Sequence, residues 1–191
     1  MINADAVRRF RELCEPARNV VLATHVNPDG DALGSEVSLA AFLRTRGSTV
    51  RIVNHDATSE LLRFIELPDL QVELYESRVH DAVLRAGDLV ILVDNSAPDR
   101  LGRMEPLLRE VAGHTLCIDH HPMRDSPWAD NIVDVGACAT TAMIWRLGKA
   151  CGWVPDPASA RAIYVGLATD TGFFRFNSTT AEAHEIAAEL L

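Results

Sequence analysis

Hydrophobic residues in this chain follow two patterns that alternate along its length. Short, almost continuously apolar runs are typical of strands buried in a parallel sheet. Longer stretches repeat apolar residues at the spacing of an amphipathic helix. The runs that predict strands are residues 20–24, 50–53, 89–93, 115–118 and 132–135. The stretches that predict helices are residues 4–16, 32–46, 59–65, 76–86, 98–112, 138–151, 157–171 and 180–191.

This alternation predicts an α/β fold with a mostly parallel central sheet flanked by helices. Gly47 and Gly87 follow two of the predicted helices, where a glycine commonly ends a helix. A chain of 191 residues suits one domain of ordinary size. We therefore expect a single domain over residues 1–191, with ligands bound beyond the carboxyl ends of its strands.

Acidic and histidine side chains come directly after three of the predicted strands. The segment His25-x-Asn-Pro-Asp29-Gly-Asp31 follows the first apolar run. Further aspartates and histidines follow two later runs, and one more aspartate lies near the end of a predicted helix. The full set is His25, Asp29, Asp31, Asp94, Asp119, His120, His121 and Asp170. Because parallel strands end at one edge of a sheet, we expect these side chains to meet there.

Each member of this set also has a purely structural interpretation. Asp29-Gly30 is a common turn dipeptide, Asp94 can cap the helix that follows, and Asp170 lies where a helix can end. Together, however, neighbouring carboxylates are costly to bury unless cations compensate them. The nearby sequence offers little lysine or arginine, so the pattern predicts bound metal.

Carboxylate and imidazole ligands without thiolate suit manganese or magnesium, and the mixed nitrogen and oxygen set favours manganese. Two such ions can clamp a phosphoryl oxygen and activate water, which is a phosphoester-hydrolysing arrangement. Gly34 and Ser35 lie near the start of the predicted helix 32–46, where free N–H groups favour anions. We expect these two residues to bind substrate.

The motifs resemble the four N-terminal motifs of the DHH phosphoesterase superfamily, which takes its name from the Asp119-His120-His121 triplet. The resemblance covers roughly residues 15–191, with the motifs in order. Within the superfamily the chain is most similar to the RecJ-like branch of bacterial oligoribonucleases and 3′-phosphoadenosine-5′-phosphate phosphatases. The segment 166–176 is similar to the fourth motif of that branch.

This resemblance implies two divalent ions and a role for each residue. The ligands fall into two sets that share a bridging Asp94: His25 and Asp29 for one ion, and Asp31, His120 and Asp170 for the other. Asp94, Asp119 and His121 are the implied catalytic residues. Asp119 is expected to orient His120, and His121 to face the substrate phosphate or the leaving group.

Some neighbouring residues keep two interpretations. Arg175 either contacts a substrate phosphate or forms a surface salt bridge. Thr140 and Thr141 either touch substrate or cap the helix that they begin. The aromatic rings at 173, 174 and 176 either stack on a base or pack in the core.

The superfamily carries a second, C-terminal domain with a glycine-rich, histidine-containing substrate motif. This sequence ends at Leu191 without that motif. We therefore expect residues 1–191 to be the metal domain alone, ending near the linker to the other domain. An apolar face left uncovered in this way could support a homodimer.

Charge and hydropathy narrow the partners and the location. A net charge of −9 argues against a long nucleic acid tract and against a strand-tracking exonuclease, which need basic surfaces. A short phosphorylated substrate stays compatible, because metal ions supply local positive charge. No apolar run is long enough for a membrane span, and no signal pattern opens the chain, so we expect a cytoplasmic protein. The four cysteines are interpreted as free thiols.

Three functions are compatible with these residues. The one we favour is a metal-dependent phosphoesterase that acts on short oligoribonucleotides, 3′-phosphoadenosine-5′-phosphate or cyclic dinucleotides. The resemblance supplies that substrate range. The alternatives are a manganese-dependent inorganic pyrophosphatase and a nucleotide- or metal-binding domain that is inactive without its C-terminal half.

Overall fold

The computed structural model describes residues 2–95, 97–123 and 126–191. Within them, six strands form one sheet in the order β3-β2-β1-β4-β5-β6, and every neighbouring pair is parallel. The strands are β1 (Asn19–Ala23), β2 (Thr49–Asn54), β3 (Val72–Leu74), β4 (Leu89–Val93), β5 (Thr115–Asp119) and β6 (Asp130–Val133). This sheet confirms the expected α/β fold.

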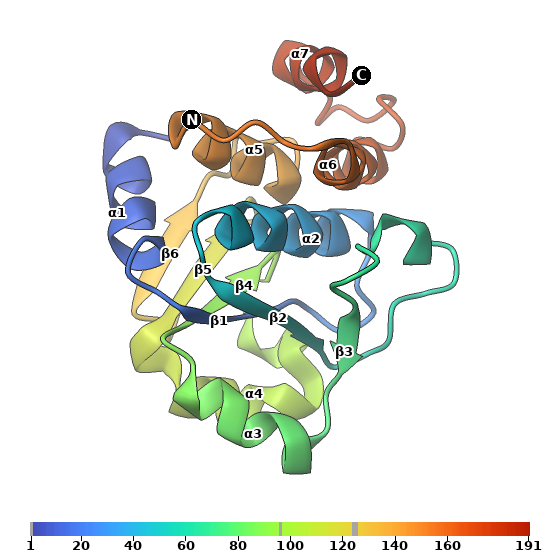
Figure 1. Ribbon diagram of the computed structural model, residues 1–191. Helices are drawn as coiled ribbons and strands as arrows, with labels where there is room; N and C mark the ends of the chain where they lie inside the picture. Colours follow the sequence, from blue (N-terminus) through green and yellow to red (C-terminus); the bar gives the residue numbers. More distant parts are fainter. Residues whose placement is uncertain (1, 96, 124–125) are drawn as a thin grey trace.

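Helices cover both faces of the sheet. The α-helices are α1 (Ala4–Cys14), α2 (Gly30–Thr45), α3 (Ser77–Ala86), α4 (Glu105–Glu110), α5 (Thr140–Ala150), α6 (Pro157–Asp170) and α7 (Ala181–Leu190). The short 3-10 helices are η1 (Arg63–Ile65), η2 (Pro98–Met104) and η3 (Ala112–His114). In Figure 1, α2, α5 and α6 lie on one face, α3 and α4 lie on the other, and α7 packs outside α6.

The central strands are apolar throughout because both of their faces are covered. All five residues of β4 are buried. Ile91 and Val93 belong to the core beneath α2, α5 and α6, whereas Val90 and Leu92 belong to the core beneath α3 and α4. Successive side chains therefore alternate between two cores, as the two-residue period of a strand requires.

The contact between α2 and α6 is especially close. Gly34 makes it possible, because a β-carbon there would lie 2.5 Å from the carbonyl oxygen of Ala162. At Gly30, a β-carbon would lie 2.6 Å from Oγ1 of Thr169. The two glycines thus let the start of α2 approach the end of α6, where Asp170 lies.

The strand order reverses between β1 and β4. The connection after β1 leads to β2 on one side of this point, and the connection after β4 leads to β5 on the other side. At such a reversal, the loops after the two strands separate and leave a crevice at the carboxyl edge. The motifs around His25 and Asp94 follow these two strands. The fold therefore places them at the usual ligand position of an open α/β sheet.

The observed elements differ most from the sequence predictions at four places. Edge strand β3 was not predicted, and β6 begins and ends two residues earlier than the expected strand 132–135. The expected helix at 59–65 is reduced to the short η1. The expected helix at 98–112 is divided, because the backbone kinks inside η2 at Gly102, whose φ of +54° is not helical.

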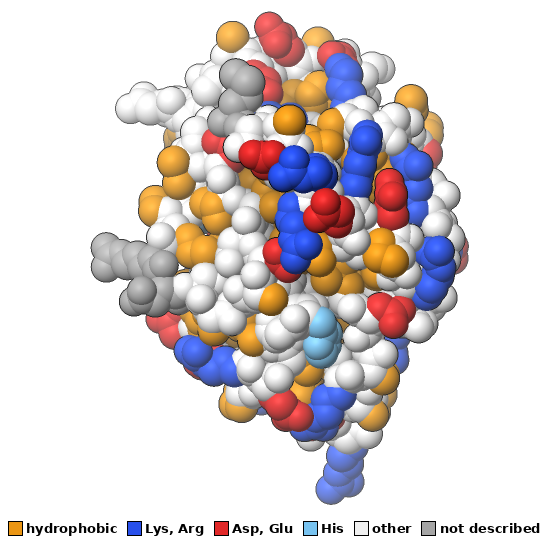
Figure 2. All heavy atoms as spheres, turned by 90° about the vertical axis from the view of Figure 1, so that its left-hand side faces the viewer, with side chains coloured by type: hydrophobic (Ala, Val, Ile, Leu, Met, Phe, Trp, Pro, Cys, Tyr) orange, Lys and Arg blue, Asp and Glu red, His pale blue; other side chains and the backbone are white. Residues whose placement is uncertain are grey.

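No helix among the described residues is both long and apolar enough to cross a bilayer. Figure 2 shows the face of the molecule that lies to the left in Figure 1, where basic and acidic side chains lie beside one another. An ion pair of this kind joins α1 to β6, with Arg9 Nε and Asp130 Oδ1 separated by 2.5 Å. Mixed charge of this kind does not form the basic stripe that long nucleic acids require.

Candidate metal centre

Three strand ends and two helix ends meet at the carboxyl edge of the sheet. His25 follows β1, Asp94 follows β4, and the triplet that starts at Asp119 ends β5. The start of α2 supplies Asp29 and Asp31, and the end of α6 supplies a further aspartate. Local structure explains part of this placement, because Oδ1 of Asp29 caps α2 by accepting 3.0 Å hydrogen bonds from the backbone N–H groups of residues 31 and 32.

His25, Asp29 and Asp94 form the first of the possible metal-binding groups, with ligand atoms all within 4.8 Å of one another. Nε2 of His25 lies 3.6 Å from Oδ2 of Asp94 and 4.0 Å from Oδ2 of Asp29. His25 and Asp94 are buried, whereas the side chain of Asp29 is 57% exposed. The group therefore opens to the surface on the side of Asp29.

Asp31, His120 and Asp170 form a second group of the same kind. Nε2 of His120 lies 3.4 Å from Oδ2 of Asp170 and 3.9 Å from Oδ2 of Asp31. The same nitrogen lies 3.7 Å from Oδ1 of Asp94. Asp94 thus faces His25 with one carboxylate oxygen and His120 with the other, so the two groups adjoin at this residue.

The histidine hydrogen bonds test whether a cation fits here. Nδ1 of His25 lies 2.7 Å from the carbonyl oxygen of Val26, and Nδ1 of His120 lies 3.2 Å from that of Ala137. A carbonyl oxygen only accepts, so each Nδ1 carries a proton, and in the neutral ring each Nε2 presents a lone pair. Both Nε2 atoms are buried and have no hydrogen-bond partner. Lone pairs directed at carboxylates repel them, and a divalent cation between the two relieves that repulsion.

The electrostatics of the carboxylates point the same way. Burial raises the pKa of Asp31 well above its usual range, and the nearby Asp94 and Asp170 raise it further. Burial also raises the pKa of Asp170, with Asp94 adding to the effect. Burial opposes ionisation of Asp94 as well, yet the imidazoles of His121, His25 and His120 around it lower its pKa below the usual value. Three crowded carboxylates of this kind favour bound cations.

The start of α5 holds two of these carboxylates in place. The backbone N–H groups of Thr140 and Thr141 donate to Asp31 at 2.6 and 2.9 Å, and Oγ1 of Thr141 donates to it at 2.7 Å. Oγ1 of Thr140 donates to Asp94 at 2.9 Å. Neither of the two interpretations made from the sequence, cap or substrate contact, anticipated this. The threonines lie about a hundred residues from Asp31, and no spacing in the sequence links them.

The sequence of this chain is similar to that of a known protein family. Residues 19–167 match the family described as "DHH family, N-terminal domain". The chain belongs to the DHH family. Its sequence is 34% identical over 178 residues to a bifunctional oligoribonuclease and PAP phosphatase of Bacillus subtilis, covering 90% of this chain and 52% of that protein. The protein of the same description from Thermus thermophilus is 33% identical over 172 residues, covering 90% of this chain and 49% of its own length.

A solved structure shows the same DHH fold over the whole chain. The exopolyphosphatase-related protein from Bacteroides fragilis superposes with a TM-score of 0.93 at 27% identity, covering 100% of this chain and 57% of its own. The chain thus spans about half the length of the curated relatives it matches.

Asp119 in the DHH triplet holds the last residue of that triplet. Nδ1 of His120 contacts the carbonyl oxygen of Ala137. Oδ1 of Asp119 accepts from the backbone N–H of His121 at 2.8 Å and lies 2.9 Å from its Nδ1. These bonds with Asp119, helped by Asp94, raise the pKa of His121 to about 10. The ring of His121 is therefore fixed, and its side chain is 46% exposed.

The structure places Gly34 and Ser35, which were expected to bind substrate, inside helix α2. Helix α2 begins at Gly30, two residues earlier than expected, so its free N–H groups precede Gly34. Both residues are buried. Gly34 faces the backbone of α6, and its small size serves helix packing.

Arg175 and two phenylalanines form an open segment beside Asp170. Arg175 is exposed, and its Nε donates to the carbonyl oxygen of Gly172 at 2.9 Å. Phe173 and Phe176 are 67% and 58% exposed, so core packing was the wrong interpretation for these two rings. Phe174 instead packs between Tyr164 and His184, with ring centroids 6.1 and 5.2 Å away.

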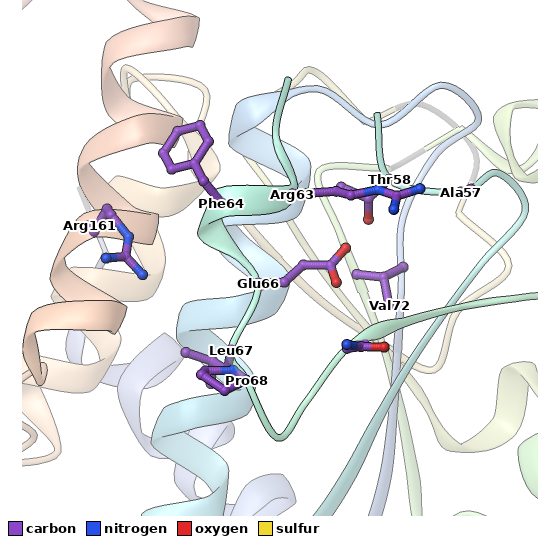
Figure 3. A pocket seen from close by; sticks show the side chains of 10 residues that line it. Ala57, Thr58, Arg63, Phe64, Glu66, Leu67, Pro68, Val72 and Arg161 are labelled. Carbon is purple, nitrogen blue, oxygen red and sulfur yellow. The ribbon is translucent and has the colours of Figure 1, made fainter. Parts of the chain in front are cut away.

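A cavity of about 590 Å³ lies away from these residues. Figure 3 shows its lining, which includes Thr58, Arg63 and Glu66 near η1 and Arg161 on α6. None of the acidic or histidine residues of the DHH motifs lines this cavity. The cavity is therefore separate from the candidate metal centre at the carboxyl edge of the sheet.

Proposed function

We propose that this chain is the metal domain of a two-metal phosphoesterase that acts on short nucleotides, and that residues 1–191 form a single domain. The observation that carries the proposal is a pair of adjoining groups, His25 with Asp29 and Asp94, and Asp31 with His120 and Asp170. Oδ1 of Asp94 lies 3.7 Å from Nε2 of His120 and so connects the first group to the second. Each group presents a buried imidazole Nε2 without a hydrogen-bond partner. The substrates would be oligoribonucleotides of a few residues, 3′-phosphoadenosine-5′-phosphate or cyclic dinucleotides.

The ligand sets follow from the two groups. One ion would be held by His25 and Asp29, the other by Asp31, His120 and Asp170, with Asp94 contributing to both. Donors of oxygen and imidazole nitrogen without thiolate favour manganese, with magnesium as the alternative. Bound there, two such ions polarise phosphoryl oxygens and lower the pKa of water.

Other residues of the site would orient the metal ligands and bind the substrate. Thr140 and Thr141 hold the carboxylates of Asp31 and Asp94 at fixed positions, which limits the reorganisation needed when a cation binds. Asp119 fixes the ring of His121, whose other nitrogen can donate a hydrogen bond to a substrate phosphate or to the leaving oxygen. The proposed catalytic residues are therefore Asp119 and His121, together with Asp94, which would contribute to both metal ions.

The surroundings of Asp170 support a substrate that carries a base. Exposed Phe173 and Phe176 offer rings on which a nucleobase can stack, and Arg175 offers a charge for phosphate. Pyrophosphate has no group that uses these rings. The relatives described as oligoribonucleases and PAP phosphatases support the same substrate class.

A turnover panel tests this proposal. The chain, supplied with manganese, is assayed on a diribonucleotide, 3′-phosphoadenosine-5′-phosphate, a cyclic dinucleotide and pyrophosphate. We expect hydrolysis of at least one nucleotide and none of pyrophosphate. Asp94→Ala should reduce the rate at least about a hundredfold, since metal charge stabilisation is worth several kcal/mol.

Asp5→Ala is the matched control, because Asp5 is an exposed aspartate on α1 outside the motifs. It should retain full activity. Full turnover by Asp94→Ala would contradict the proposal. Tight nucleotide binding by the wild-type chain without any turnover would instead support the alternative of a binding domain that is inactive alone.

A further inference from the structure

Asn54 is the last residue of β2. It is fully buried, and both ends of its side-chain amide are used. Its Oδ1 accepts a 3.2 Å hydrogen bond from the backbone N–H of Thr24. Its Nδ2 donates a 2.7 Å hydrogen bond to Oε2 of Glu36 on α2. Buried amides satisfied at both ends have a defined orientation.

Thr24 connects the Asn54 amide to the ends of β1 and β4, which are followed by the proposed metal ligands His25 and Asp94. The paired residues of β1 and β4 end at Ala23 and Leu92, so the N–H of Thr24 lies beyond the strand ladder. Asn54 supplies the acceptor that the sheet no longer provides. Oγ1 of Thr24 donates to the carbonyl oxygen of Val93 at 2.7 Å. The residue before His25 is thereby tied to the residue before Asp94.

We propose that Asn54 is a positioning residue that fixes the ends of β1 and β4 so that His25 and Asp94 face one cation. The inference rests on the proposed function for the identity of the cation. Asn54 touches neither substrate nor ion, and it acts through Thr24.

Glu36 fixes which way round the amide lies. Nδ2 of Asn54 must find an acceptor in a fully buried environment, and Oε2 of Glu36 is that acceptor. This directs Oδ1 toward Thr24. A glutamine at position 36 keeps an acceptor oxygen at the same place, whereas leucine removes it and leaves the amide donor unsatisfied.

The test compares manganese affinity and amide exchange in the intact chain. Asn54→Leu removes both hydrogen bonds at similar volume. Changes to partners that orient metal ligands typically cost roughly 10–100-fold in affinity, and we expect a loss in that range by calorimetry. In the metal-free protein, the Thr24 amide should exchange with solvent at least about tenfold faster, which is the effect of losing a bond worth about 1.4 kcal/mol.

Three further variants separate positioning from general destabilisation. Glu36→Gln should retain manganese affinity, and Thr24→Val should weaken it by breaking the link to Val93. Thr115→Val is the control, because Oγ1 of this buried threonine donates to Val111 at the opposite edge of the sheet. It should destabilise the fold without changing manganese affinity.

Manganese binding by Asn54→Leu at wild-type affinity, with unchanged exchange of the Thr24 amide, would overturn the inference. An equal loss of affinity in Thr115→Val would overturn it as well. A wild-type chain that binds no manganese would contradict the proposed function instead, and the exchange of the Thr24 amide would then decide the positioning role alone.

Discussion

The non-glycine residues with left-handed backbone among those described all belong to the DHH motifs. Asn27 and Asp94 have φ values of +52° and +54°, and Phe173 and Phe174 have +58° and +63°. A β-carbon makes this conformation costly, and proteins retain it where a side chain must be aimed. At Asp94 this backbone conformation directs the carboxylate between His25 and His120.

Residue types at strand ends were enough to predict which side chains meet. The aspartates and histidines of the four motifs lie together because the carboxyl ends of parallel strands share one edge. Asn54 and Thr140 were beyond reach of the sequence. Their roles depend on contacts 30 and 46 residues away along the chain, which no local pattern records.

Glu36 gives a prediction about pH. Burial raises the pKa of its carboxyl from 4.5 to about 8, with Glu66 adding to the effect. A carboxyl whose pKa is raised on folding stabilises the protein below the unfolded value, and that stability is lost as pH rises toward 8. Glu36→Gln does not titrate. Between pH 5 and pH 9, the free energy of unfolding of Glu36→Gln should therefore rise relative to that of the wild type by on the order of 4 kcal/mol.

Urea denaturation of both proteins across this pH range measures the effect. The two stability curves should diverge between about pH 5 and pH 8 and run parallel above that. Curves that stay parallel throughout would show that Glu36 is ionised in the folded protein.

Elements with a strong pattern were predicted closely, and weak ones were not. The strand at 89–93 was predicted with its exact bounds because five consecutive apolar residues leave no alternative. Edge strand β3 has three residues and only partial burial, so it lacks such a pattern. The division at Gly102 depends on a positive φ, which a glycine permits but which the presence of a glycine does not by itself predict.

The α2–α6 contact gives a prediction at this scale. Gly34→Ala places a β-carbon 2.5 Å from a backbone carbonyl oxygen of α6, and backbone cannot move aside easily. We expect the free energy of unfolding to fall by about 1–3 kcal/mol, measured by urea denaturation. Gly113→Ala is the control, since a β-carbon there meets nothing within 4 Å. Equal stability of the two variants would show that α2 and α6 pack less closely than described.

At the scale of the whole molecule, 27 acidic residues outnumber 18 basic ones. Several of the acidic side chains are gathered at one edge of the sheet, where burial and mutual repulsion oppose their ionisation. Bound divalent cations would offset this charge and stabilise the folded chain. The fold class and the position of this edge could be predicted from alternating strands and helices. The distances between the carboxylates could not, because they depend on how α2, α5 and α6 pack.

The number of manganese ions that bind per chain tests the central claim most directly. Calorimetric titration of the wild-type chain should give two ions, with the thermal midpoint rising as the sites fill. Asp94→Ala should weaken binding of both ions, whereas Asp5→Ala should bind as the wild type does. A wild-type chain that binds no manganese, or an Asp94→Ala variant that binds two ions with unchanged affinity, would contradict a centre built around Asp94.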